Sequence, residues 1–260
     1  MIDRRRQIQE ESDRFAAVLA DCDPSSGVPS CPQWTVVDLL SHLVTVQRFW
    51  AAVIGNTLSG AAVAEYKRSR APLPEDLATL LVLRGRATTD LLAALDSRDA
   101  SEPAWSWFAA DQTVGFTWRM QTHEATMHRV DAELAAGRPI SPITREVAEH
   151  GVDHVVDVMW AWAPPEAERQ VTGTIELAAT DTGRRWLVRT FRWSGQAWGQ
   201  QFTDQIGCER TDRGEVDATI SGTAQDLDLL AWTRADHNIT RSGSSHALTE
   251  LQAMLDDGIR

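Results

Sequence analysis

Residues 31–50, CPQWTVVDLLSHLVTVQRFW, decide the fold of the first half of the chain. Thr35, followed three residues later by Asp38, is typical of a capping box, in which the two side chains satisfy open backbone amides at a helix start. From there to about residue 54, apolar residues recur every three or four positions, which predicts an amphipathic helix. This apolar stripe consists of Leu39, Leu40, Leu43, Val46 and Phe49, and His42 lies in the middle of it.

The same periodicity predicts four further helices in the first half. We expect them at residues 3–20, 74–95, 117–136 and 144–162, separated by loops rich in Pro, Gly and Ser. Pro74 suits the first turn of a helix, and Gly137 with Pro139 ends another. Long helices with short and medium connections indicate an up-and-down helical bundle with one extra helix.

The period changes from helical to alternating near residue 168. Apolar and polar residues alternate over 171–179 and again over 216–220, and residues 186–193 form a partner strand across a turn at 181–183. Thr223 with Asp226 then caps a helix over 227–234, and a last helix ends near residue 255. The sequence therefore predicts a mixed fold, with a helical bundle over 1–163 and a small α+β domain over 168–260, joined by a Pro-Pro-Glu-Ala-Glu linker.

Composition excludes several classes of protein. With 260 residues, 43% hydrophobic and 24% charged, the chain is typical of a globular protein. We expect a cytoplasmic protein, because the sequence has no long apolar run and no apolar leader near the N-terminus. The net charge of −12 is spread over both halves, which argues against nucleic-acid binding. Three cysteines without a CxxC pattern favour free thiols, with a Cys22–Cys31 pair as the alternative.

Histidines in the helical half indicate a metal site. The segment His123-Glu124-Ala-Thr-Met-His128 is not the HExxH motif, and at about 100° per residue its two histidines point about 140° apart. Glu124 and His128 share one face, and an antiparallel neighbour could present His42 to the same ion. Such a three-ligand site with an open position suits Zn²⁺. Two alternatives stay open: a helical His is more often an ordinary core or surface residue, and His150 with His154 has the same spacing.

Two segments carry a resemblance to a known family. CPQWTVVDLLSHLVTVQRFW and HEATMHRVDAELAAGRP resemble the N-terminal metal-binding bundle of the mycothiol-dependent maleylpyruvate isomerase family, within the wider DinB-like superfamily. Residues 218–255 resemble the family's small C-terminal domain, which is similar to sterol-carrier proteins. The resemblance implies that His42, Glu124 and His128 bind zinc and that mycothiol is the thiol cofactor or co-substrate. It implies thiolate addition to an activated alkene, followed by elimination to the trans isomer or, in related members, retention of an S-conjugate.

The resemblance extends to other residues. Arg234 is the best match to the family's functional arginine and would clamp a substrate carboxylate, with a solvated helix end as the alternative and Arg241 as the substitute. From helical spacing alone, Asp131 and Asp38 each lie one turn from a predicted ligand and are candidates to orient it, with an exposed aspartate and the helix cap as the respective alternatives. Trp34 and His154 are pocket candidates. His123 is expected to be structural.

One stretch departs from the family pattern. Residues 150–154 read HGVDH where we expect the family to carry acidic residues in a DGxDE-like stretch. This difference puts maleylpyruvate itself in doubt as the substrate.

These observations favour a zinc-dependent, mycothiol-using isomerase or S-transferase acting on a small, electrophilic, carboxylated molecule. Two other classes remain as alternatives. One is a metal-dependent hydrolase that uses no thiol. The other is a protein that binds an apolar ligand and whose metal is structural. We expect no nucleic-acid or membrane partner, and the sequence leaves a monomer or a dimer open.

Overall fold

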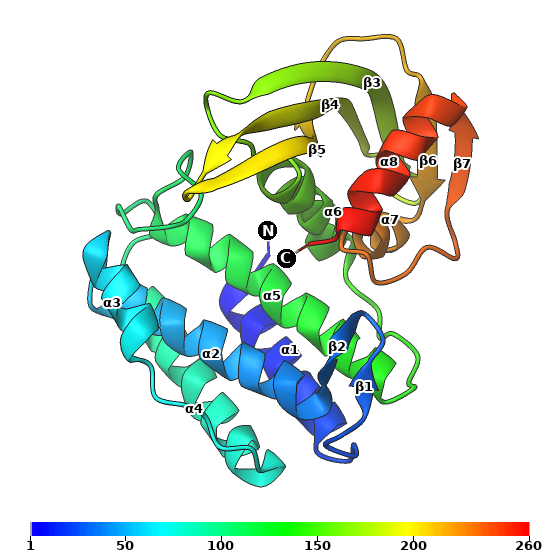
Figure 1. Cartoon of the computed structure of the whole chain (residues 1–260). Helices are drawn as coiled ribbons and strands as arrows, with labels where there is room; N and C mark the ends of the chain where they lie inside the picture. Colours follow the sequence, from blue (N-terminus) through cyan, green and yellow to red (C-terminus); the bar gives the residue numbers. More distant parts are fainter. Residues whose placement is uncertain (1, 260) are drawn as a thin grey trace. The chain divides into compact units, whose positions relative to one another are not determined.

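The computed structural model describes residues 2–259, and the chain divides between Ser141 and Pro142 into two units. The first unit is mainly helical (Figure 1). Its elements in chain order are α1 (Arg4–Leu19), β1 (Gly27–Val28), β2 (Cys31–Thr35), α2 (Val36–Gly55), α3 (Ala61–Ser69), α4 (Leu77–Asp96) and α5 (Val114–Ala135).

Four long helices form the bundle of the first unit. Helix α2 packs against α4 and α5, and α1 packs against α5. The capping box of α2 is present as predicted, because the Thr35 hydroxyl accepts from the Asp38 amide while the Asp38 carboxylate accepts from the Thr35 amide. Buried apolar side chains from all four helices, among them Phe15, Leu39 and Leu80, fill the space between them. The bundle therefore holds α2 and α5 side by side, as Figure 1 shows.

Helix α2 is also long and apolar enough to meet the length and hydropathy of a membrane span, but half of that segment is buried inside the protein. Its buried stripe packs on the other helices of the bundle. This is the behaviour of a core helix.

Two local elements of the first unit differ from prediction. The Pro- and Ser-rich segment after α1 contains the antiparallel pair β1–β2, and the connection before Pro74 contains the separate helix α3. Alanine-rich α3 has good intrinsic helix propensity but buries only Val63, so it lacks the apolar periodicity on which the prediction relied. Helix α4 begins after Asp76, whose side chain accepts from the amide of Thr79.

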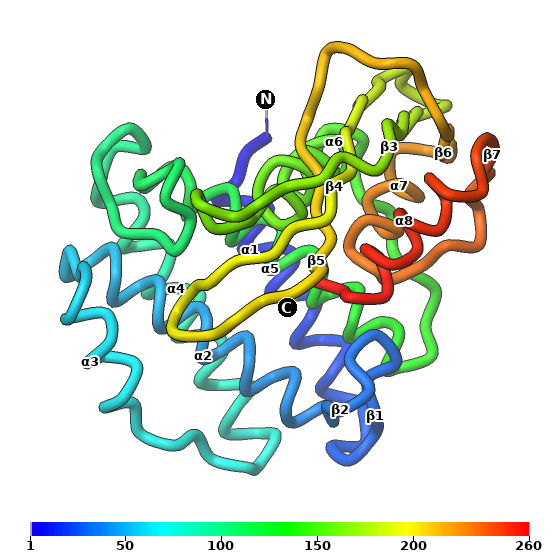
Figure 2. Tube along the Cα trace, turned by 45° about the horizontal axis from the view of Figure 1, so that its top comes forward, coloured from blue at the N-terminus to red at the C-terminus, as the bar shows by residue number. Residues whose placement is uncertain are grey.

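The second unit is α+β. It contains α6 (Arg145–His154), a π-helical turn η1 (Val155–Met159), and a five-stranded sheet with α7 (Ala224–Ala231) and α8 (Ser245–Asp257). The strands are β3 (Glu168–Ala179), β4 (Arg185–Ala197), β5 (Gln200–Arg210), β6 (Ala218–Gly222) and β7 (Thr240–Gly243). Their order is β5-β4-β3-β6-β7, with β3 and β6 parallel and all other pairs antiparallel. Strands β4 and β5 run together to a common turn (Figure 2). The predicted mixed fold class is confirmed.

The position of the division between the units differs from the sequence-based boundaries of 1–163 and 168–260. Helix α6 and η1 belong to the second unit, where α6 packs on α7 and η1 packs on β5. The Trp160 carbonyl accepts from the Cys208 amide on β5, which ties the end of this segment to the sheet. Helical periodicity identifies an apolar face but not the partner that covers it. The prediction therefore grouped this segment with the other helices.

Candidate metal centre

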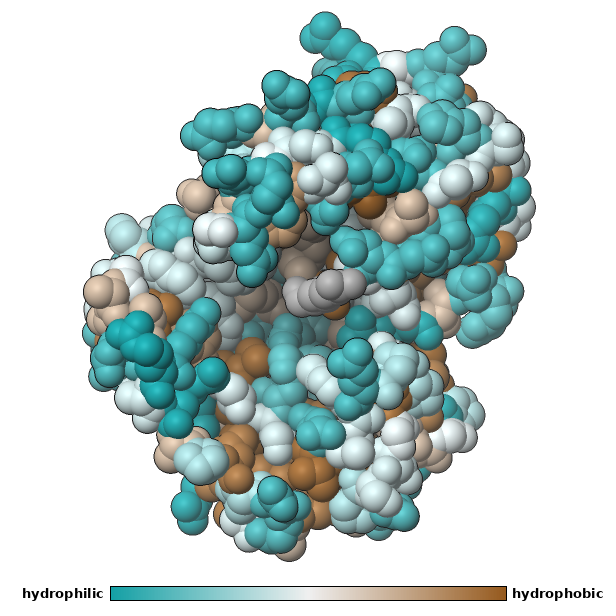
Figure 3. All heavy atoms as spheres, in the orientation of Figure 1, coloured by the Kyte–Doolittle hydropathy of each residue, from teal (hydrophilic) through white to brown (hydrophobic). Residues whose placement is uncertain are grey.

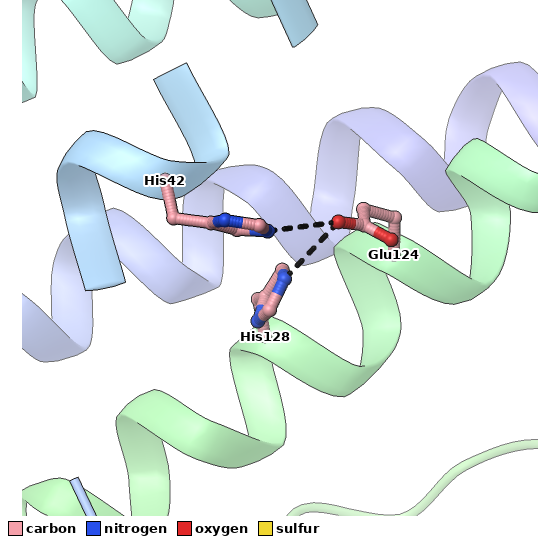
Figure 4. A group of neighbouring side chains, drawn as sticks. All are labelled: His42, Glu124 and His128. Carbon is pink, nitrogen blue, oxygen red and sulfur yellow. Dashed lines mark hydrogen bonds and ion pairs between the residues drawn. The ribbon is translucent and has the colours of Figure 1, made fainter. Parts of the chain in front are cut away.

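Three predicted ligands meet in the helical unit. His42 comes from α2, and Glu124 and His128 come from successive turns of α5 (Figure 4). The Glu124 Oε1 atom lies 3.1 Å from His42 Nε2 and 3.2 Å from His128 Nε2. One ligand atom from each residue lies within 4.8 Å of the other two. Among residues 2–259, this is the only such group of three or more His, Cys, Asp or Glu side chains.

Helix geometry explains how the triad forms. Glu124 and His128 are four residues apart, so their side chains share one face of α5. His42 interrupts the apolar stripe of α2, and the packing of that stripe on the bundle turns His42 toward α5. The triad is partly open, because the side chains of His42 and Glu124 are 31% and 21% exposed. A ligand could therefore reach it from solvent.

Asp131 orients the second histidine. Its Oδ2 atom lies 2.9 Å from His128 Nδ1, and its Oδ1 atom accepts a hydrogen bond of 2.5 Å from the hydroxyl of Ser30. Asp131 is fully buried. With the Nδ1 proton directed at Asp131, Nε2 of a neutral His128 presents its lone pair to the triad, which is the arrangement usual for metal-bound histidines.

The pKa values of the triad reflect this arrangement. Burial by itself lowers the pKa of His128, but the hydrogen bonds to Asp131 and Glu124 outweigh it and raise that pKa to about 9. Burial likewise raises the pKa of Glu124, and hydrogen bonds from His128 and His42 reverse this and hold it below its ordinary value. Glu124 is therefore ionised, and the proton on His128 occupies the position that a cation would take.

The residues present fit a divalent metal ion. Nitrogen and oxygen ligands at about 2.1 Å from a tetrahedral ion lie about 3.4 Å apart, close to the separations of 3.1 and 3.2 Å between Glu124 and the two histidines. Two imidazoles and one carboxylate form the donor set of a three-ligand site that keeps a fourth position open. The Trp34 ring, 4.7 Å from the His42 ring and 6.4 Å from the His128 ring, covers one side. The ring of Trp34 thus lies beside the two histidines.

The other predicted site residues have contacts of their own. The Asp38 carboxylate accepts from Thr35, so its contacts are those of the helix cap and not those of a partner for His42. His154 belongs to the second unit, where its ring stacks on Trp232 at 6.0 Å. Arg234 follows the end of α7 and donates to the carbonyl of Trp232. The substitute candidate Arg241 lies on β7, 3.7 Å from Asp236.

Sequence reasoning missed Ser30. This residue lies in the tight connection between β1 and β2, a hundred residues from the aspartate that it contacts. A single serine in a Ser- and Pro-rich loop carries no pattern that marks it. Its only signal is that a buried carboxylate such as Asp131 needs donors.

The fold and the site define a two-part protein whose helical unit carries a His-Glu-His centre suited to a divalent metal. Residues 5–133, which include all three triad residues, match the family model of the mycothiol maleylpyruvate isomerase N-terminal domain. The chain belongs to the family of proteins that contain a mycothiol maleylpyruvate isomerase N-terminal domain.

Solved structures agree with this assignment at the level of the fold. The crystal structure of the mycothiol-dependent maleylpyruvate isomerase aligns with a TM-score of 0.60 and 15% identity, over 93% of each chain. A histidine-to-alanine mutant of that isomerase aligns with a TM-score of 0.63 and 14% identity, again over 93% of each chain. A search of curated proteins gave no match to this chain.

Proposed function

We propose that this protein is a zinc-dependent enzyme that uses mycothiol as a nucleophile on a small, electrophilic, carboxylated substrate. The observation that carries the proposal is the convergence of His42, Glu124 and His128 on one point, with His128 oriented from behind by the buried Asp131. Family membership supplies the thiol, because the matching domain is described by its use of mycothiol. The cytoplasm, where thiols stay reduced, is the compartment that this chemistry requires.

Each residue of the centre has a defined task. His42, Glu124 and His128 would hold the ion, which when bound lowers the pKa of a coordinated thiol and keeps the thiolate in place. Asp131 fixes the ring of His128, and Ser30 fixes Asp131. Trp34 shields one side of the site from water. We assign the clamping of a substrate carboxylate to Arg234, as the family resemblance implies.

The cysteines of the chain explain why the thiol would come from a cofactor. Burial raises the pKa of Cys208, and burial together with Asp21 raises that of Cys22 against the opposing effect of Arg138. Both side chains therefore favour the neutral thiol, which is a poor nucleophile. A thiol bound to a metal at the triad would instead be deprotonated, and its thiolate would be the better nucleophile.

The proposed reaction begins with addition of the thiolate to an activated alkene. The former double bond becomes single and rotates, and elimination of the thiolate then releases the trans isomer with the thiol regenerated. If the adduct is instead protonated and released, the product is an S-conjugate. The two outcomes share the first bond-forming step, and only analysis of the product separates an isomerase from an S-transferase.

The test is turnover of cis-alkene carboxylates, with maleylpyruvate as one of several, in the presence and absence of mycothiol. We expect turnover only with the thiol, and loss of turnover in Glu124→Ala. The matched control Asp38→Asn changes a carboxylate one turn from His42 whose contacts lie in the helix cap, and it should keep the rate. Equal turnover without thiol would contradict the proposal and favour a hydrolase. A stoichiometric apolar ligand bound equally well by His42→Ala would favour a binding protein.

A further inference from the structure

A second cavity lies on the helical unit beside the triad. It has a volume of about 810 Å³ and lies between α2 and the segment formed by α3 and the connection to α4. This volume is in the range of small-molecule sites. The residues that line it are Ser41, Thr45, Arg48, Tyr66, Lys67, Ser69, Arg70, Ala71, Pro72 and Leu73.

The cavity shares helix α2 with the triad. Ser41 directly precedes the ligand His42, and Thr45 follows it by three residues. On an α-helix, three residues correspond to about 60° of rotation and about 4.5 Å along the axis. The wall of the cavity therefore begins within one helical turn of His42.

The lining carries positive charge in a strongly acidic protein. Arg48, Lys67 and Arg70 line the cavity, and no Asp or Glu is among the described lining residues. The net charge of the chain is −12, so the charge of this lining is opposite in sign to that of the protein as a whole. Figure 3 shows hydrophilic side chains gathered over α3.

These three cations lack carboxylate partners among the described residues. Arg68, the neighbour of Lys67 on α3, pairs with Glu65 at 2.6 Å. In contrast, Arg70 donates only to the carbonyl of Lys67, and the Lys67 amine lies over the rings of Phe49 and Trp105 at 5.1 and 5.8 Å. Cation–π contacts position this amine but leave its charge uncompensated.

Hydroxyl groups complete the lining. Ser41 and Thr45 offer hydroxyl donors beside the cations, and Leu73 supplies an apolar surface. The hydroxyls of Tyr66 and Ser69 also line the cavity, but they donate to the backbone carbonyls of Arg48 and Glu65. Cations with neighbouring hydroxyl donors are the groups that bind carboxylates through charge-assisted hydrogen bonds. We propose that this cavity binds a carboxylate group of a small organic acid. The inference rests on the proposed function only in identifying this acid with the electrophile that reacts at the triad.

The test is calorimetric titration of the whole protein with succinate, a saturated dicarboxylate that cannot react with a thiol. We expect Arg48→Gln and Lys67→Gln each to weaken succinate binding about tenfold, since each removes a charge-assisted hydrogen bond. The matched control Arg68→Gln removes a cation from the same exposed surface without changing the lining, and it should change the affinity less than twofold. An unchanged affinity in the Arg48→Gln/Lys67→Gln double variant would overturn the proposal, as would tighter binding of the neutral polyol inositol.

Lys67 provides a second readout, because it is the only lysine in the chain. Succinate should slow modification of Lys67 by an amine-directed reagent, followed by peptide mass spectrometry with the N-terminal amine as internal reference. Equal rates with and without succinate would contradict the proposal.

The His42→Ala variant separates this inference from the proposed function. Succinate binding that survives in His42→Ala but is lost in the double variant supports the cavity even if thiol-dependent turnover is never found. Succinate binding that is lost in His42→Ala and kept in the double variant would assign the anion to the triad and overturn the inference.

Discussion

Helix α5 contributes to two charged clusters, one around Arg129 and one around the adjacent His128. The first is closed, meaning that its side chains are shielded from solvent, and the second is open. In the first, the Arg129 guanidinium donates to Glu11 at 2.6 Å and to Glu133 at 2.7 Å, and these three side chains are 0%, 8% and 3% exposed. In the second, Glu124 lies between His42 and His128 and remains open to solvent. The closed cluster pairs one buried guanidinium with two carboxylates and ties α1 to α5. The open cluster faces solvent with a donor set that suits a divalent ion.

The largest effect is expected at the closed cluster. Arg129→Ala leaves two buried carboxylates without their cation and should lower the free energy of unfolding by about 3–5 kcal/mol, measured by urea denaturation. Arg68→Ala, which breaks the exposed pair with Glu65, should cost less than about 1 kcal/mol. Similar losses in the two variants would show that the Arg129 cluster is not the buried, closed unit described.

The next effect concerns the open cluster. Glu124→Ala removes the residue that both histidines contact, and the affinity for zinc should fall by more than about 100-fold. This loss is larger than the usual effect of removing a residue that only hydrogen-bonds to a metal ligand. Competition with a chromophoric chelator measures this. The free energy of unfolding without metal should change less than in Arg129→Ala, because His128 keeps Asp131. An equal fall in zinc affinity in Arg129→Ala and Glu124→Ala would contradict the claim that only the open cluster binds zinc.

A smaller effect separates two aspartates with similar spacing. Asp131→Ala removes the partner of His128 and should weaken zinc binding about 10- to 100-fold. Asp38→Ala should leave zinc binding unchanged and lower the stability by about 0.5–1 kcal/mol, because it removes half of a capping box. The same chelator competition and urea denaturation measure both variants, and a reversed order of zinc affinities would refute the assignment.

The smallest effect, when it is counted per pH unit, is a pH dependence of zinc binding at the open cluster. Below pH 9 a proton occupies His128, whose pKa is about 9, so zinc must displace it. The affinity should rise with pH by at most about tenfold per unit and level off near pH 9. In the metal-free protein, the proton on His128 stabilises the fold, because the pKa of His128 is higher in the folded chain than in the unfolded one. This stabilisation is complete below a pH of about 6.5, the pKa in the unfolded chain, and is lost as the pH rises through 9. In Asp131→Ala the plateau should begin at lower pH. A zinc affinity that is flat from pH 6.5 to 9 would contradict the protonation described.

Local signals in the sequence were sufficient for much of the fold. The capping boxes at Thr35 and Thr223 are present in the structure because they depend only on residues three positions apart. The change from helical to alternating periodicity correctly marked the mixed architecture. The pairing of Glu124 with His128 is likewise local, since it follows from helical spacing alone. The position of His42 in an apolar stripe made it a candidate ligand, but no local pattern joins residues 82 positions apart, and the family resemblance supplied that link.

The remaining features depend on tertiary contacts that periodicity does not encode. His150 and His154 have the same spacing as Glu124 and His128, but they lie on α6 in the other unit, where His154 stacks on Trp232. Asp131 contacts a ligand and Asp38 caps a helix, although each lies one turn from a histidine of the triad. Strand β5 escaped prediction because its exposed outer positions weaken the alternating pattern.

The most direct test of the account is the metal content of the purified protein, measured by elemental mass spectrometry beside Glu124→Ala and the double variant His150→Ala/His154→Ala. We expect about one zinc per chain in the wild type and in the double variant, and little or none in Glu124→Ala. Metal retained in Glu124→Ala and lost in the double variant would contradict this expectation and move the centre to α6.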